Sequence, residues 1–175
     1  MTQGKPGLIM VITGDGKGKT TAAVGQAIRA VGHGYRVMMI HFMKGRDYGE
    51  FLATVDMPNL TVVRAGRDDF VKKGNPDKID VDLAEDGFKK ASEAINNGQY
   101  DMVVLDEINV ALDYGLLEEK IVIEMLKNKP HDVTIILTGR NASPELVKLA
   151  DTVSEVLAIK HHYQSGIKSC AGIEY

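Results

Sequence analysis

The residues with the clearest chemical potential form the run Thr13 to Thr21, TGDGKGKTT. Its glycines let successive backbone N–H groups turn inward around an anion, because no Cβ blocks the approach. A helix that begins at the end of such a loop adds the positive end of its dipole. Lys19 supplies a mobile positive charge for phosphate oxygens, and Thr20 supplies a hydroxyl able to coordinate Mg²⁺. The run is therefore a candidate phosphate cradle.

This run is close to the phosphate-loop pattern GxxxxGK[ST], with Gly18, Lys19 and Thr20 in place and Thr13 where the first glycine belongs. Residues 8–12, LIMVI, predict a buried strand before it, and residues 22–30 predict a helix after it. That context is the one the motif requires. The alternative interpretation is an ordinary glycine-rich turn with solvated lysines. The loop indicates a nucleoside triphosphate but not the reaction that follows.

A second candidate lies at residues 100–108, YDMVVLDEI, where an apolar run ends in Asp106 and Glu107. A strand buried on both faces has no structural use for charges at its end. A Mg²⁺–triphosphate site, in contrast, needs an acidic partner there to hold the metal or its waters. The structural alternative is that the two carboxylates open a loop or cap the next helix.

Three further features are ambiguous in the sequence alone. Arg140 follows the apolar run 133–137 and could reach a phosphate or a carboxylate ligand, or lie on the surface. Arg29 falls on the last turn of the first predicted helix, where the dipole also favours a solvated cation. The polar loop after residues 36–42, with Lys44 and Glu50, is placed either to line a site or to be solvated.

Apolar runs of strand length alternate with helical patterns along the chain. This alternation predicts an α/β fold with a mostly parallel sheet and helices on both faces. The phosphate loop and the acidic pair would then meet at one edge of a P-loop nucleotide-binding fold. The predicted strands are 8–12, 36–42, 60–64, 100–108, 133–137 and 153–159, and the predicted helices are 22–32, 81–95, 116–126 and 144–150.

Composition narrows the class of protein. A chain of 175 residues fits a single domain spanning 1–175, and its net charge of −3 argues against a protein that wraps nucleic acid. No apolar run approaches the roughly 20 residues of a membrane span. Cys170 cannot form an internal disulfide, so we expect a cytoplasmic protein. With His161 and His162 it lacks a recognisable metal-ligand spacing.

Longer segments carry a more specific resemblance. They are GDGKGKTTAA, HFMKG followed by GE, VVLDEINVALDYGLL, TGRNASPEL, LADTVSEV and KHHYQSGIKSCAGIEY. In these segments the chain resembles the ATP:corrinoid adenosyltransferases of the P-loop, RecA-like type. The resemblance implies a homodimer in which the Co(I) of cobalamin or a precursor attacks C5′ of ATP and releases triphosphate. It places the reaction in adenosylcobalamin biosynthesis or salvage, with a separate flavoprotein or flavin as reductant.

The resemblance also implies roles for particular residues. Lys19 and Thr21 are expected on phosphate oxygens, and Thr20 on Mg²⁺. Glu107 resembles the family's metal ligand, which makes Lys19 and Glu107 the expected catalytic residues, and Arg29 matches an arginine that contacts the nucleotide. ATP would lie across the loop in the direction opposite to that in hydrolases, so that C5′ faces the corrinoid. The implied triphosphate-binding residues are Gly14, Asp15, Gly16, Lys17, Gly18, Lys19, Thr20 and Thr21.

Two departures from the family pattern affect how the site is completed. Some members have a longer N-terminal segment that helps to cover the active site, which residues 1–7 are too short to do. The best-known members carry the pattern GFxW after the third strand, where this chain has Gly66-Arg67-Asp68-Asp69-Phe70 and no tryptophan. Our hypothesis is that Phe70 packs on the corrin side of the cavity.

Two other functions remain open at this stage. A P-loop kinase or ATPase would use Lys19, Thr20 and Asp106 to transfer the γ-phosphate, and it would make ADP. A non-catalytic nucleotide or corrinoid carrier would bind its ligand without turnover.

Overall fold

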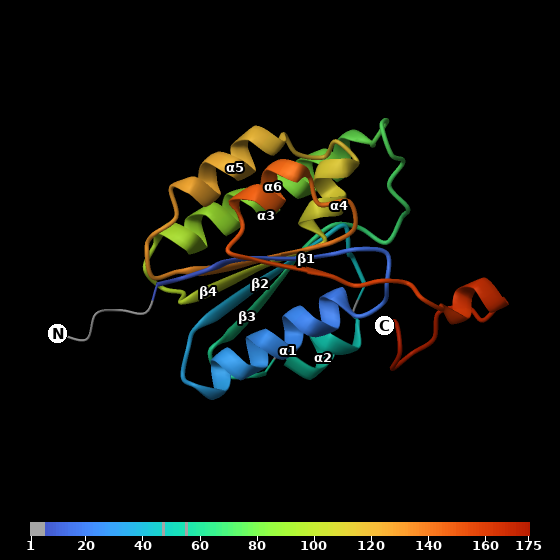
Figure 1. Cartoon of the computed structure of the whole chain (residues 1–175), viewed down its shortest axis with the longest axis horizontal. Helices are drawn as coiled ribbons and strands as arrows, with labels where there is room; N and C mark the ends of the chain where they lie inside the picture. The colour runs from blue at the N-terminus through green and yellow to red at the C-terminus, as the bar shows by residue number, and fades with distance from the viewer. Residues whose placement is uncertain (1–5, 47, 55) are drawn as a thin grey trace.

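The structure is a computed structural model that describes residues 6–46, 48–54 and 56–175. Its centre is one six-stranded sheet in the order β3-β2-β4-β5-β1-β6, in which every neighbouring pair is parallel (Figure 1). This confirms the predicted parallel α/β fold. The strands are β1 Ile9–Thr13, β2 Val37–Phe42, β3 Leu60–Ala65, β4 Met102–Asp106, β5 Thr134–Thr138 and β6 Thr152–Glu155.

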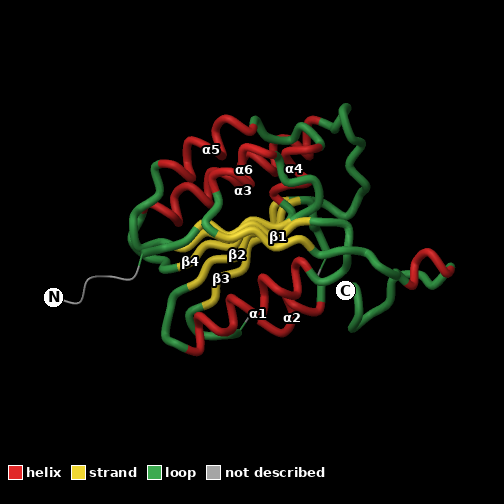
Figure 2. Tube along the Cα trace, in the orientation of Figure 1, coloured by secondary structure: helices red, strands yellow, loops and turns green. Residues whose placement is uncertain are grey.

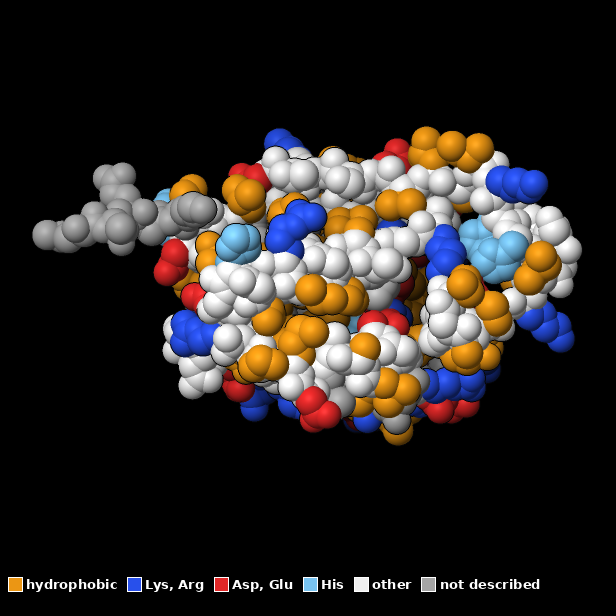
Figure 3. Space-filling model, turned by 90° about the horizontal axis from the view of Figure 1, so that it is seen from below, with side chains coloured by type: hydrophobic (Ala, Val, Ile, Leu, Met, Phe, Trp, Pro, Cys, Tyr) orange, Lys and Arg blue, Asp and Glu red, His pale blue; other side chains and the backbone are white. Residues whose placement is uncertain are grey.

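Helices cover both faces of the sheet, as predicted (Figure 2). One face carries α1 Lys19–Gly32 and α2 Gly49–Thr54. The opposite face carries α3 Lys78–Asn96, α4 Ile108–Asp113, α5 Glu119–Lys127 and α6 Pro144–Leu149. A short 3₁₀ helix, His162–Ser165, follows the last strand. Seen from the α1–α2 side, apolar side chains lie among charged ones (Figure 3).

The sheet is apolar on both sides because both sides are covered. All residues of β2 and β4 are buried, which is typical of central parallel strands. Successive side chains point to opposite faces, so Ile40 joins the core under α3, whereas Met39 joins the core under α1. Helix α1 buries Ala23 and Ala27 there, and these small side chains let it pack closely on the strands.

The strand order gathers the loops that carry the candidate residues. β1 lies between β5 and β6, and β2 pairs with β4. Because all strands run in the same direction, their carboxyl ends face one edge of the sheet, where ligands bind in open α/β folds. The phosphate loop, the loop after β2, the acidic pair after β4 and Arg140 after β5 therefore share one edge.

Some local predictions were wrong. The loop expected after β2 contains helix α2. Asp80 directly precedes the predicted helix 81–95, where the type of residue favours a cap, but it lies in the first turn of α3. It is buried there and paired with Arg67 at 2.6 Å between Oδ1 and Nε. The last strand ends at Glu155 rather than at residue 159. Ser143 does cap α6, accepting a hydrogen bond from Leu146 N at 3.2 Å, with Pro144 next to it.

Within the described residues, no helix is long and apolar enough to cross a membrane.

Candidate active site

The phosphate loop leaves β1 and packs against the chain that follows β6. Gly16 N donates a hydrogen bond to Val156 O at 2.7 Å. A Cβ on Gly16 would lie 2.6 Å from Leu157 O, and a Cβ on Gly14, whose φ is +97°, would lie 2.5 Å from Val156 O. Thr13, at the first position of the motif, accepts a hydrogen bond from Ala142 N at 3.2 Å. The shape of the loop is therefore fixed by contacts with the segments that follow β5 and β6.

Lys19 is the first residue of α1, and its side chain folds back across the loop. Its ammonium donates to Gly16 O at 2.7 Å, and the residue is buried. Burial lowers the pKa of Lys19, and the nearby charge of Glu107 partly opposes this shift. The ammonium is thus held at the loop, within reach of an anion that the loop would bind.

Thr20 is fixed by the fully buried carboxylate of Asp106. The hydroxyl of Thr20 donates to Asp106 Oδ1 at 2.8 Å, and the hydroxyl of Thr138 donates to the same oxygen at 2.7 Å. Asp106 was predicted to hold the metal or its waters. Both of its oxygens accept hydrogen bonds from protein donors, and it is not among the residues that line the pocket, so in this structure it orients Thr20. Its role toward the metal or its waters stays a prediction.

The other oxygen of Asp106 receives two more donors. His41 Nδ1 and Lys44 Nζ each lie 2.8 Å from Asp106 Oδ2. Burial alone would raise the pKa of Asp106, but the hydrogen bond from His41 and the charge of Lys44 outweigh it and hold the pKa well below its ordinary value. Asp106 is therefore ionised, and because a carboxylate only accepts, His41 Nδ1 carries the proton.

Glu107 points the other way, into the pocket. Its backbone has φ +62°, a left-handed conformation that is uncommon for residues other than glycine. Its N–H donates to Thr138 Oγ1 at 2.9 Å. Burial and the charge of Asp106 raise the pKa of Glu107, although Lys44 and Lys19 oppose the shift. The unusual turn separates two adjacent carboxylates, one buried and one facing ligand space.

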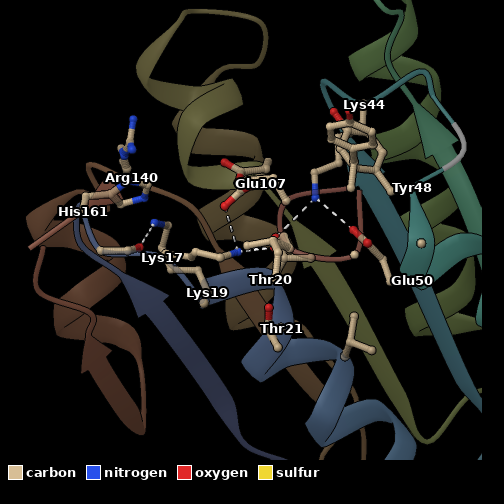
Figure 4. A pocket seen from close by; sticks show the side chains of 18 of the residues that line it. Lys17, Lys19, Thr20, Thr21, Lys44, Tyr48, Glu50, Glu107, Arg140 and His161 are labelled. Atoms are coloured by element: carbon tan, nitrogen blue, oxygen red, sulfur yellow. Dashed lines mark hydrogen bonds and ion pairs between the residues drawn. The ribbon is translucent and has the colours of Figure 1, made fainter. Parts of the chain in front are cut away.

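These side chains surround a pocket of about 610 Å³ (Figure 4). The sequence-predicted residues Asp15 to Thr21, Glu107 and Arg140 all line it. Arg140 Nε lies 3.5 Å from Asp15 Oδ1, across the loop from Lys19. A second pocket of about 510 Å³ shares Lys19, Glu107 and Arg140 and extends to Lys73. The site thus offers two adjoining spaces around one phosphate loop.

A family model described as "ATP:corrinoid adenosyltransferase BtuR/CobO/CobP" matches residues 5–175. The chain belongs to this family.

Curated relatives agree with the family model. The corrinoid adenosyltransferase of Escherichia coli K12 is 39% identical over 176 residues, covering 99% of this chain and 88% of the relative. That of Sinorhizobium sp is 39% identical over 172 residues, covering 97% of this chain and 80% of the relative. Among solved structures, the flagellar accessory protein FlaH from Methanocaldococcus jannaschii has a TM-score of 0.59 at 16% identity, covering 86% of this chain and 71% of FlaH. This likeness concerns the fold, which is the RecA-like P-loop fold.

Two residues that the adenosyltransferase resemblance singled out lie away from these pockets. Arg29 is exposed in the last turn of α1, where Nη1 donates to Gln26 Oε1 at 3.2 Å. It is ten residues after Lys19, or about 15 Å along the helix. Phe70 is fully exposed, at 101% of its reference area, and lines neither pocket. Its packing on a corrin remains a prediction.

One segment that lines the pocket was not among the predicted site residues. Gly172, Ile173, Glu174 and Tyr175 line it, at the end of the chain. Lys17 donates to Ile173 O, and its Nζ lies 3.6 Å from Glu174 Oε1. The prediction about cover from the N-terminus falls mostly on residues 1–5, outside the described residues. Residues 172–175 therefore form part of the wall of the pocket.

The pocket residues fit a divalent cation only in part. The hydroxyl oxygen of Thr20 and the carboxylate of Glu107 are hard oxygen ligands on adjacent walls of the pocket. In the described part of the chain, no group of three or more His, Cys, Asp or Glu is arranged to hold a metal ion. A cation bound here would need further ligands from nucleotide phosphates and water, as Mg²⁺ usually does.

Proposed function

We propose that this chain transfers the 5′-deoxyadenosyl group of ATP to the Co(I) centre of a corrinoid and releases triphosphate. The observation that carries the proposal is the convergence of the phosphate loop, Glu107 and Arg140 on one pocket, in a member of the ATP:corrinoid adenosyltransferase family. The domain that does this would span residues 1–175.

The phosphate loop is suited to the leaving group of this reaction. Backbone N–H groups of residues 14–18 and the start of α1 favour bound negative charge. Lys19 would exchange Gly16 O for a phosphate oxygen, and Arg140 would reach the phosphates from the opposite wall. Because negative charge grows on the triphosphate as the bond to C5′ breaks, these fixed positive groups stabilise the transition state more than the bound substrate.

No protein base is needed. The Co(I) substrate donates the electron pair that forms the cobalt–carbon bond, and the pair of the C5′–O bond leaves on the triphosphate. No proton moves in this step. The task of the protein is therefore to place the two reactants in line, a contribution that can be large. The adjoining space beside Lys73 would take part of the second substrate.

Thr20 and Glu107 would hold Mg²⁺ if the ion accompanies ATP here. The ion would neutralise part of the triphosphate charge. Asp106 contributes to this site through Thr20. It accepts a hydrogen bond from the hydroxyl of Thr20, which turns the lone pairs of that oxygen toward the pocket.

The remaining assignments rest on the resemblance. We propose a homodimer, for which exposed apolar side chains such as Leu157 and Ile159 offer surface to cover. A flavoprotein or flavin would reduce the corrinoid, and the protein would work in the cytoplasm.

The test is an anaerobic incubation of the protein with Mg-ATP and chemically reduced cobalamin. Loss of the Co(I) absorbance, with adenosylcobalamin and triphosphate formed in equal amounts, is the expected result. Lys19→Ala should abolish both products, whereas Lys89→Ala, a charge change on the exposed side of α3, should preserve them. Formation of ADP at the same rate with or without cobalamin would instead identify a kinase or ATPase. Binding of both ligands without any product would identify a carrier.

A further inference from the structure

Lys44 occupies an unusual position for a lysine near a phosphate loop. It follows β2, and its ammonium lies 2.8 Å from Asp106 Oδ2 and 3.3 Å from Thr20 Oγ1 (Figure 4). Only 14% of its side chain is exposed. The ammonium therefore lies against the hydroxyl that would bind Mg²⁺.

A divalent ion and this ammonium would compete for the same oxygen. The hydroxyl of Thr20 gives its proton to Asp106, and Lys44 donates to one of the lone pairs that remain. An ion coordinated by Thr20 would lie about 2.1 Å from that oxygen. Two cations so close in a partly dry site repel each other strongly. A divalent ion bound to Thr20 would therefore favour displacement of the Lys44 ammonium from that oxygen.

The backbone around Lys44 is tightly held. Met43 has φ +59°, a strained conformation for a methionine. A Cβ on Gly66 would lie 2.5 Å from Lys44 N, and one on Gly45 would lie 2.5 Å from the carbonyl carbon of Arg67. The loops after β2 and β3 thus pack without space between them. Any movement of the ammonium must come from the four-carbon side chain rather than from the loop.

In the same position the ammonium also contacts two groups outside the phosphate loop. Glu50 Oε1 lies 3.5 Å from Lys44 Nζ, and the centre of the Tyr48 ring lies 5.1 Å from it. A carboxylate and an aromatic face both stabilise an ammonium group. Tyr48 lies just before α2, and Glu50 lies in its first turn, beside Lys44 (Figure 4).

We propose that Lys44 is a resident cation, which holds the position beside Thr20 in the nucleotide-free protein and moves onto Glu50 and Tyr48 when a divalent ion enters with ATP. The inference depends on the proposed function only in taking ATP as the ligand. Lys44 is in this sense a positioning residue. It keeps Thr20 and Asp106 in place before the metal arrives. Lys44 also sets how strongly ATP binding depends on the metal.

The test compares the dissociation constant of ATP in EDTA with that in saturating Mg²⁺, both measured by calorimetry. The quantity reported is the ratio of the first constant to the second. Lys44→Met should raise this ratio at least roughly tenfold, since metal-free ATP loses a cation and Mg²⁺ loses its competitor. Glu50→Gln should lower the ratio, because the displaced ammonium loses its acceptor while its contacts with Asp106 remain. Arg46→Met removes an exposed charge from the same loop, paired with Asp68 at 3.5 Å, and should leave the ratio unchanged.

Lys44→Met removes a donor from the buried Asp106 and is the variant at risk of misfolding. Glu50→Gln keeps Lys44 paired with Asp106 and is expected to shift the ratio in the opposite direction, so it tests the proposal even if Lys44→Met does not fold. Equal weakening of ATP binding in both buffers by Lys44→Met would mean that Lys44 stays in place beside the metal, and would overturn the proposal. An unchanged ratio in Glu50→Gln would show that the ammonium does not move onto Glu50, and would overturn that part of the proposal. No corrinoid is present, so a failure of adenosyl transfer would leave these ratios as they are.

Discussion

Thr20 Oγ1 lies 2.8 Å from Asp106 Oδ1, joining the first turn of α1 to the carboxyl end of β4. The two residues are separated by 86 positions in the chain, and Asp106 is fully buried. The hydroxyl rotor of Thr20 is fixed by this contact before any ligand binds. The buried carboxylate of Asp106 thus decides where the oxygen lone pairs of Thr20 point.

The pH dependence of stability provides a test of this contact. The folded-state pKa of Asp106 lies below its ordinary value of 3.8, so the ionised carboxylate contributes stability above that pH. The contribution is lost as the pH falls through the folded-state pKa. Asp106→Asn should lower the free energy of unfolding by about 3 kcal/mol at pH 7. Urea titrations should show the gap to wild type narrowing from pH 4 downward, and a gap that stays constant would contradict the assignment.

Gly16 should not tolerate a side chain, because its Cβ would lie 2.6 Å from Leu157 O. We expect Gly16→Ala to destabilise the protein by on the order of 1–3 kcal/mol and to weaken ATP binding. Gly25→Ala is the matched control: it lies in α1 with nothing within 4 Å of the added Cβ, and should stabilise by up to about 1 kcal/mol. Thermal unfolding of the two variants with and without ATP provides the comparison.

Removal of residues 172–175 should open the pocket. These residues form part of its lining, and Lys17 holds them through Ile173 O. We expect ATP affinity to fall by roughly tenfold, comparable to the loss of one good contact. Lys17→Met should weaken binding in the same direction without shortening the chain. Equal ATP dissociation constants for the full and shortened proteins would show that the segment is not a wall of the site.

Phe70 offers a clean test of the corrin hypothesis because its side chain is fully exposed. Phe70→Ala should change the free energy of unfolding by less than about 0.5 kcal/mol, as exposed substitutions usually do. If Phe70 packs on the corrin, the variant should bind cobalamin more weakly and alter the Co(II) spectrum. Unchanged corrinoid affinity and an unchanged spectrum would end the hypothesis.

The fold and the phosphate loop could be predicted from local patterns. The run Gly18-Lys19-Thr20 and the apolar strand before it are contiguous in the chain, so a single stretch contains the whole signal. Ser143 followed by Pro144 likewise predicts the start of α6. Asp106 and Glu107 lie at the carboxyl end of β4, as predicted. Which of the two carboxylates is buried and which faces the pocket depends on the left-handed backbone conformation of Glu107.

The contacts that complete the site depend on which strands are neighbours. His41 and Asp106 lie opposite each other in the register of β2 and β4, which no spacing in the sequence reveals. Lys17 and Ile173 are 156 positions apart. Local propensity does not decide whether Asp77 or Asp80 caps α3, because both are good capping residues. The guanidinium of Arg67 donates hydrogen bonds to both carboxylates. Each of these outcomes is decided by tertiary packing rather than by local propensity.

The position of β1 between β5 and β6 has a consequence for the order of folding. β1, which precedes the phosphate loop, pairs with strands that begin at Thr134 and Thr152, far from it in the sequence. Such long-range pairing forms slowly and late. The phosphate-loop sequence is therefore synthesised well before β5 and β6, and the loop becomes rigid only when those two strands have joined β1. Nucleotide binding would then report that β5 and β6 are in place.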